Sequence, residues 1–209
     1  RPRDPASDLT SGLLAARPAF SDTEMAGMVR LLLIGGHTVS ANFLGSAVRH
    51  LANDIALQDR LRRAPELLPS TIEEMLRLYS PNQALVRTTT RAVTVRGQII
   101  PPGQPVAMLY ISGNRDADAF ERPDEFVLGR APNAHIAFGH GIHKCIGQAF
   151  ARLQARVALG DLLGATARFE RIGRAEASAW PEYGVARMRV RLRWADRSAG
   201  SIVPKHTAE

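Results

Sequence analysis

The chain has 209 residues, 45% of them hydrophobic and 22% charged, which is the composition of a globular protein able to bury a core. The net charge is +7, but the arginines that carry it are scattered and lack interleaved stacking aromatics, so we expect no nucleic-acid partner. The single cysteine excludes an internal disulfide, an iron–sulfur cluster and a multi-cysteine zinc site, and it indicates a reducing, cytoplasmic compartment.

The first residues, RPRDPASD, contain no initiator methionine and no charged-then-apolar signal pattern. We therefore treat the chain as a candidate fragment of a longer protein. A long helix is predicted to begin soon afterwards, because residues 21–24, SDTE, form a capping box between Ser21 and Glu24. The apolar run that follows predicts that this helix continues to about residue 51.

Segment 31–48 of this helix has no formally charged side chain and reaches the lower limit of membrane-spanning length. It also holds polar side chains that would need partners in hydrocarbon, namely His37, Thr38, Ser40, Asn42 and Ser46. A buried central helix of a soluble domain is therefore favoured, with no membrane contact. The Gly35-Gly36 pair suits either close helix packing or the approach of another group to the backbone, and composition favours neither.

A second helix is predicted over residues 70–80, STIEEMLRLYS, with Ser70 as its cap, Glu73 closing a capping box and Pro81 stopping it. One face is apolar, because Ile72, Met75, Leu76 and Tyr79 recur at helical spacing. Arg77 lies within reach of both Glu73 and Glu74. As surface pairs, these would contribute only about 0.2–0.5 kcal/mol.

From residue 85 onward the sequence favours strands. VRTTTRAVTVRGQIIPPGQPVAM has short β-branched runs broken by Arg-Gly and Pro-Gly pairs, which predicts two-stranded ribbons. A polar, turn-rich connection follows, and then a helix whose apolar face would be formed by Ile146, Phe150, Leu153 and Val157. The tail VARMRVRLRW alternates apolar residues with arginine, as a half-exposed strand does.

The only cysteine, Cys145, lies in the stretch FGHGIHKCIG, residues 138–147, just before that helix. A helix N-terminus and the neighbouring Lys144 both favour a thiolate. Three readings stay open on the residues alone. Cys145 could join His135, His140 and His143 in a compact metal site; it could be the sole protein ligand of a porphyrin iron; or it could be a nucleophile paired with His143.

The order of these features resembles the C-terminal half of a cytochrome P450, a haem-thiolate monooxygenase, from about Asp8 to Trp194. The stretch FGHGIHKCIG fits the family's cysteine loop at its motif positions, Phe138, Gly139, Gly141, His143, Cys145 and Gly147. Residues 74–77, EMLR, fit the family's E-x-x-R helix, whose pair of Glu74 and Arg77 is buried and structural.

The resemblance implies a mainly α fold with small β-ribbons (α+β). Residues 1–209 would form the C-terminal haem-binding part of the P450 fold, from the distal long helix through the cysteine loop to the C-terminus, without the family's N-terminal half. It implies haem b (iron protoporphyrin IX) as cofactor, with Cys145 as the axial ligand of the iron. Arg87 and His135 would be partners of the haem propionates, and Phe138, Gly139, His143 and Gly147 would shape the loop.

The resemblance also marks where the pattern departs from the family. Members usually carry an acid and a threonine after the glycine of the distal helix, and here Thr38, Val39 and Ser40 follow Gly35-Gly36-His37. These five positions, Gly35, Gly36, Thr38, Val39 and Ser40, would line the oxygen groove. Their chemistry predicts atypical proton delivery: substrate-assisted, peroxide-dependent, or replaced by oxidative coupling.

Two further expectations follow from the resemblance. Glu125 occupies the place of the arginine that usually joins the E-x-x-R pair, so Arg122 or Arg130 is expected to replace it. Electrons would come from a ferredoxin or flavodoxin, docked on a basic face formed by Lys144, Arg152 and Arg156. The substrate would be a small organic molecule. The other hypotheses are a haem-binding remnant without turnover and a His/Cys metal-binding module.

Overall fold

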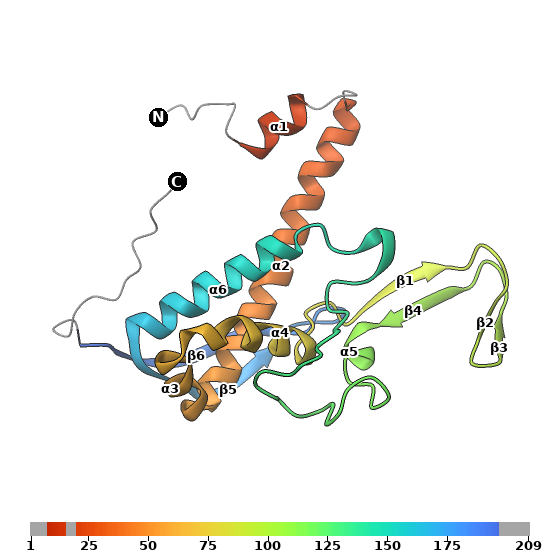
Figure 1. Cartoon of the computed structure of the whole chain (residues 1–209). Coiled ribbons are helices and arrows are strands. Elements are labelled where there is room, and N and C mark those ends of the chain that lie inside the picture. The colour runs from red at the N-terminus through yellow and green to blue at the C-terminus, as the bar shows by residue number, and fades with distance from the viewer. Residues whose placement is uncertain (1–7, 16–19, 197–209) are drawn as a thin grey trace. The chain divides into compact units, whose positions relative to one another are not determined.

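The structure, a computed structural model, describes residues 8–15 and 20–196. It divides into two compact units, Arg1–Thr38 and Val39–Glu209, and each is described by itself. The described residues are mainly helical, with small two-stranded antiparallel sheets (Figure 1). This confirms the predicted combination of helices and ribbons.

The first unit contains α1 (Leu9–Ala15) and the beginning of α2 (Asp22–Asn53). The predicted capping box is present. The amide of Ser21 donates to Glu24 Oε2 at 2.9 Å, and the amide of Glu24 donates to Ser21 Oγ at 3.3 Å. These two bonds satisfy amides that have no partner within the helix, which explains why α2 begins where the sequence predicts.

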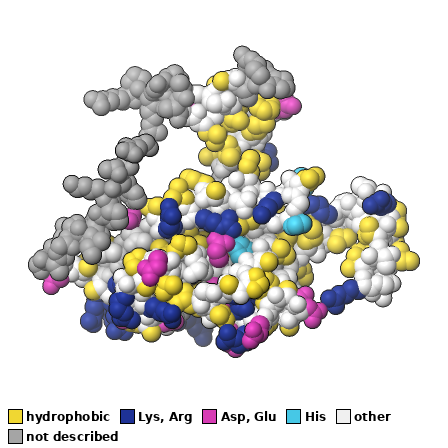
Figure 2. Space-filling view, in the orientation of Figure 1, with side chains coloured by type: hydrophobic (Ala, Val, Ile, Leu, Met, Phe, Trp, Pro, Cys, Tyr) yellow, Lys and Arg dark blue, Asp and Glu magenta, His cyan; other side chains and the backbone are white. Residues whose placement is uncertain are grey.

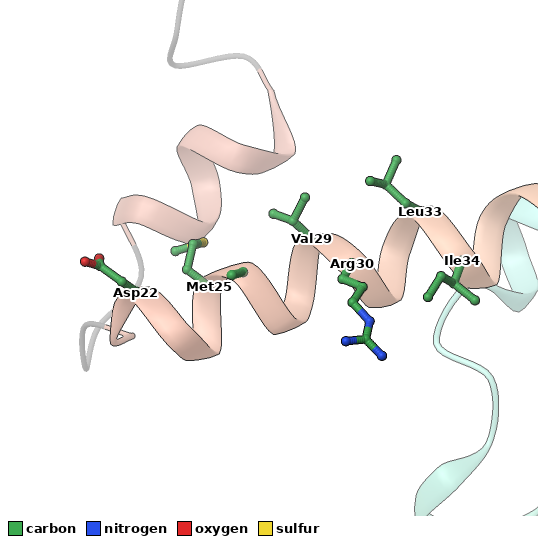
Figure 3. Close-up of a pocket in the computed structure, with 7 residues that line it drawn as sticks. Asp22, Met25, Val29, Arg30, Leu33 and Ile34 are labelled. Atoms are coloured by element: carbon green, nitrogen blue, oxygen red, sulfur yellow. The ribbon is translucent and has the colours of Figure 1, made fainter.

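The N-terminal half of α2 differs from the buried central helix that the sequence predicts. Residues 31–38 are exposed, and Leu33 keeps 68% of its surface. Apolar side chains cover this part of α2 in Figure 2, and a shallow groove here is lined by Asp22, Met25, Val29, Arg30, Leu33 and Ile34 (Figure 3). The pattern of uncharged residues predicted burial, whereas the buried side chains of α2 begin only at Asn42.

By length and apolar composition α2 could cross a membrane. Core helices of soluble proteins can have the same length and apolar composition. The buried side chains of α2 include the polar residues Asn42 and Ser46. Asn42 has hydrogen-bonding partners within the protein, since its side-chain amide donates to Glu182 Oε2 and its side-chain oxygen accepts from Ser178 Oγ, and such a group suits a protein interior better than hydrocarbon.

The core of the second unit is formed by buried apolar residues of four helices and one strand: α2, α3 (Ile55–Arg63), α4 (Leu68–Leu78), α6 (Gln148–Ala165) and β5 (Thr166–Ala177). From α4 come Ile72, Met75 and Leu76, all almost fully buried, which confirms the predicted apolar face of this helix. Gln58 is also fully buried, and its amide nitrogen donates to the carbonyls of Leu51 and Phe169 at 2.7 and 2.8 Å.

The start of α4 (Leu68–Leu78) corrects the predicted capping box at Ser70. The helix begins two residues earlier, after a short 3-10 turn at Pro65–Leu67 and with Pro69 in its first turn. Ser70 therefore lies inside the helix, where its hydroxyl donates to the carbonyl of Leu67 at 2.9 Å. Proline is well suited to the first turn because its missing N–H has no partner there.

The apolar face predicted from Ile146 to Val157 is also corrected. Ile146 precedes α6, and Phe150, Leu153 and Val157 are exposed. The buried side of α6 is instead formed by Ala155, Leu159 and Leu163. Both sets recur at helical spacing, so periodicity alone could not tell which of the two faces the core.

The strands form three antiparallel pairs among the described residues, and they confirm the predicted ribbons. β1 (Ala84–Thr88) pairs with β4 (Pro105–Leu109), and β2 (Val93–Val95) pairs with β3 (Gln98–Ile100) within the same hairpin. β5 pairs with β6 (Val185–Trp194), the predicted arginine-rich strand. The short helix α5 (Tyr110–Gly113) leads from β4 towards the loops of the site.

The two faces of α6 give a direct test of the packing. We expect Leu159→Ala to lower the free energy of unfolding by about 2–5 kcal/mol, because it removes a fully buried side chain. The matched control is Leu153→Ala on the exposed face, where the side chain keeps 46% of its surface. Denaturant unfolding monitored by circular dichroism measures both, and equal losses would contradict this assignment of the core.

Candidate functional site

Glu74 and Arg77 of α4 form a fully buried ion pair. The guanidinium donates from Nε to Glu74 Oε2 at 2.9 Å and from Nη2 to Glu74 Oε1 at 2.8 Å. Its remaining bonds go to the backbone carbonyls of Asn114, Pro123 and Glu125. Helical spacing alone would make this a surface pair, whereas the family resemblance implies a buried, structural one. The pair is buried, and the five hydrogen bonds of Arg77 anchor the segments around Asn114 and residues 123–125 to α4.

The Glu74 carboxylate also binds the segment that leads into the cysteine loop. It accepts from the amide of Val127 at 2.9 Å, from Arg130 Nε at 3.0 Å and from Asn133 Nδ2 at 3.2 Å. Arg130 is thus the third member of the cluster, one of the two expected alternatives, whereas Arg122 pairs with the exposed Glu125. Burial opposes ionisation of Glu74, but the hydrogen bonds from Arg77, from the Val127 amide and from Arg130 outweigh it and hold the pKa of the carboxyl below its usual value.

Asn114, which is fully buried, connects this cluster to the loop. Its carbonyl accepts from Arg77, and its side-chain oxygen accepts from the amide of Ile136 at 2.7 Å. Its side-chain amide donates to Ser80 Oγ at 2.7 Å. Asn114 therefore has a structural function, because it fixes where the cysteine loop begins.

The cysteine loop itself is folded by glycines and by one backbone bond. Gly139 and Gly141 have φ values of +72° and +74°, a conformation that side chains disfavour. The amide of Cys145 donates to the carbonyl of Phe138 at 2.9 Å, which closes the loop. Gly147 is the N-cap residue of α6, and a Cβ added there would lie 3.9 Å from Cys145 Sγ. The thiol is exposed near this helix N-terminus.

The four-ligand metal site considered from the sequence does not form. Among the described residues, no group of three or more His, Cys, Asp or Glu side chains is placed to hold a metal ion. His140 and His143 are exposed, whereas the His135 ring is directed to Glu73, with Nε2 lying 3.0 Å from Glu73 Oε2. The amide of Ala137 donates to the other ring nitrogen of His135.

Glu73 and Arg152 form an ion pair in the site that the sequence did not predict. Arg152 of α6 donates from Nε to Glu73 Oε1 at 2.7 Å and from Nη2 to Glu73 Oε2 at 2.9 Å. The pair compensates the charge of Arg152, one of the three residues of the expected docking face, and docking at this face stays a prediction. The S-x-x-E pattern had suggested a capping role for Glu73, and no local signal pointed to a partner so distant in sequence.

The expected oxygen-groove positions fall in both units. Gly35, Gly36 and Thr38 are exposed, and a Cβ added at either glycine would meet no described atom within 4 Å. Val39 and Ser40, in the second unit, line a cavity of ≈ 30 Å³ together with Phe138 of the cysteine loop. The Ser40 hydroxyl donates to Gln154 Oε1 at 3.2 Å.

Arg87, the other expected propionate partner, lies on β1. Its side chain is exposed, and Nη1 donates to the carbonyl of Val86 at 3.0 Å. The structure therefore brings His135, Phe138 and Cys145 into one cluster, and it leaves Arg87 on an exposed strand.

The chain is similar to known proteins in both sequence and fold. The family model described as Cytochrome P450 matches residues 2–165. The chain belongs to the cytochrome P450 family. It is 42% identical over 164 residues to cytochrome P450 107B1 of Saccharopolyspora erythraea, covering 77% of this chain and 40% of that protein. It is 39% identical over 177 residues to the erythromycin C-12 hydroxylase of the same organism, covering 82% and 44%.

Solved P450 structures match the fold as well. CYP109E1 of Bacillus megaterium in complex with corticosterone superposes with a TM-score of 0.82 at 36% identity, over 88% of this chain and 50% of that one. This chain thus spans about half the length of the P450 relatives that it matches. The match confirms a partial P450 fold.

P450 proteins hold haem through a cysteine thiolate, and the residues around Cys145 fit such a group. Ile142 and Ile146 are 99% and 94% exposed, and both flank the thiol in the chain. Two almost fully exposed isoleucines beside a thiol, which is a soft metal ligand, are typical of a surface that a flat, apolar macrocycle covers. Gly139 and Gly141, which suit the positive φ angles at these positions, carry no Cβ and leave the backbone uncovered by side chains at the same place.

The buried pair of α4 gives the prediction of this subsection. We expect Glu74→Gln to lower the free energy of unfolding by about 3–5 kcal/mol, because Arg77 would keep a buried charge without its partner. Denaturant unfolding measures this loss.

The matched control is Glu125→Gln, whose side chain is 62% exposed and pairs at the surface with Arg122. This change is expected to cost at most about 1 kcal/mol. A loss of similar size in both variants would contradict the anchoring role of Glu74.

Proposed function

We propose that this chain is the C-terminal, haem-binding part of a P450 monooxygenase that oxidises a small organic substrate with O2 and external electrons. The observation that carries the proposal is the exposed Cys145 in a glycine-turned loop, closed on Phe138 beside the N-terminus of α6. Haem b would bring the oxygen chemistry, and the protein would supply ligation, electrostatics and shielding from water.

In this proposal the residues of the site have different roles in haem binding. Cys145 would ligate the haem iron, and Phe138, Gly139, His143 and Gly147 would shape the loop that carries the ligand. Arg87 meets a propionate, which its exposed guanidinium supports. Both ring nitrogens of His135 have partners in the protein, so we propose that its main role is to position the loop. Glu74 and Arg77 are structural.

The electron donor is proposed to be an acidic ferredoxin or flavodoxin. Lys144 and Arg156 are exposed on either side of the start of α6 and provide the attraction. Arg152 is not included, because its charge is paired with Glu73. As an enzyme with a protein donor of this type, the protein would act in the cytoplasm.

The substrate is proposed to be a largely apolar natural product. One relative is named as a hydroxylase of erythromycin, and one structural neighbour holds corticosterone. The distal chemistry is proposed to be atypical. Val39 is apolar, and the proton of Ser40 is engaged with Gln154. The three forms proposed are proton delivery assisted by the substrate, use of peroxide as the oxidant, and oxidative coupling.

The ligand assignment is tested by spectroscopy of the haem-loaded protein. We expect the reduced carbon monoxide complex of the wild type to show a thiolate-type Soret band, and Cys145→Ser to abolish it. Matched metal analysis should find iron and no stoichiometric zinc. Binding of zinc without haem would contradict the proposal, and haem binding without any turnover of substrate would favour a remnant.

The distal assignment is tested by Val39→Thr, alone and combined with Thr38→Glu. We expect the double variant to convert a larger fraction of consumed NADPH into oxidised product, because it supplies the missing hydroxyl and acid. The peroxide-driven rate should change much less and serves as the control. Tight coupling in the wild type, with no gain in either variant, would contradict an atypical proton supply.

A further inference from the structure

Two consecutive carboxylates on α4 bind different partners. Successive helix positions point about 100° apart, so Glu74 faces the buried cluster around Arg77 while Glu73 faces α6 and the cysteine loop. Glu73 binds His135, which precedes Cys145 in the chain, and Arg152, which follows it. One carboxylate therefore joins both ends of the segment that carries the thiol.

The contacts of Arg152 lead from Glu73 towards the thiol. Nε and Nη2 donate to the two carboxylate oxygens of Glu73. Nη1 donates to Oε1 of Gln148, in the first turn of α6, at 3.2 Å. The guanidinium carbon lies 4.5 Å from the centre of the Phe138 ring. Because the carbonyl of Phe138 accepts from the amide of Cys145, the path from Arg152 to the cysteine passes through a single residue.

The pair is charged at neutral pH. Burial opposes ionisation of Glu73, but hydrogen bonds from His135 and Arg152 lower its pKa to about 2. The hydrogen bond to Glu73 raises the pKa of Arg152. Its charged, bidentate geometry distinguishes this contact from an ordinary surface ion pair, in which long side chains rarely share one fixed arrangement.

We propose that Arg152, held by Glu73 and stacked on Phe138, is a positioning residue that sets the cysteine loop for ligation of the haem iron. The inference rests on the proposed haem-thiolate function. Arg152 touches neither substrate nor haem in this account. It acts through Phe138 and the backbone bond to Cys145, as partners behind a metal ligand commonly do.

The test compares variants of the haem-loaded, full-length protein. Arg152→Gln and Glu73→Gln are each expected to accelerate loss of haem to an apoprotein acceptor by about tenfold. Each should also shift part of the reduced carbon monoxide complex from the thiolate-type Soret band to that of a lost thiolate. The double variant should be no worse than either single variant, because both remove the same contact.

Two further variants separate positioning from stability. Arg152→Lys keeps the charge but loses the two-point grip and the flat stacking surface, so an intermediate effect is expected even if Arg152→Gln does not fold. Arg62→Gln is the matched structural control, because Arg62 ties the other end of α6 to α3 through the carbonyls of Leu163 and Thr166. It should lower the melting temperature without changing haem loss or the Soret band.

The inference is overturned if Arg152→Gln and Arg152→Lys behave like Arg62→Gln, with lower stability but unchanged haem loss and an unchanged band. Additive effects of Glu73→Gln and Arg152→Gln would also overturn it. A wild-type protein that binds haem without the thiolate-type band would overturn the proposed function as well. A wild type with the band and variants that keep it would overturn the inference alone.

Discussion

The buried ion pair between Glu74 and Arg77 is the interaction on which the rest of the site depends. Burying two charges costs several kcal/mol per ion unless their hydrogen-bonding capacity is satisfied. Here Arg77 is satisfied by the carboxylate and by carbonyls of the connection after α5. Glu74 binds the next stretch through Val127 and Arg130. A long, irregular connection is thereby fixed on a single helix turn.

This arrangement explains how a loop with little secondary structure can present a thiol in a defined place. Asn114 fixes the entrance of the loop through the amide of Ile136, and Glu73 holds its two flanks. The thiol itself needs only the glycine turns and the bond to Phe138. Ile142 and Ile146 on either side of the thiol stay exposed, which suits the proposed ligation of a large flat group.

Local patterns predicted those parts of the fold that depend on neighbouring residues. The capping box at Ser21, the apolar face of α4 and the ribbons were all readable because their causes lie within one element. Helical spacing did not reveal the burial of Glu74, since the same spacing occurs at protein surfaces, and only the family resemblance implied it. The contacts that bury the pair, those of Glu74 with Arg130 and of Arg77 with Asn114, join residues far apart in the sequence. The partner of Glu73 lies on α6, and the local S-x-x-E pattern suggested a cap instead.

Two predictions failed for a related reason. Periodicity identified an apolar face on α6, and a run without charged side chains suggested burial of α2, but what covers a face is a property of the whole fold. In the described residues Leu153 and Leu33 stay exposed, while Leu159 carries the core. The cysteine loop was recognised from its glycines and its single thiol, because its shape is determined locally by Gly139 and Gly141.

The adjacency of Glu73 and Glu74 has a consequence for how α4 can change during evolution. Either carboxylate can be replaced separately, with losses confined to its own partners. Inserting or deleting one residue before Glu73 would instead rotate both by about 100° and detach the buried cluster and the cysteine loop together. We therefore expect α4 to tolerate changes of side chain on its other faces much better than any change of length before Glu73. The register of the helix is what directs Glu73 and Glu74 to their separate partners.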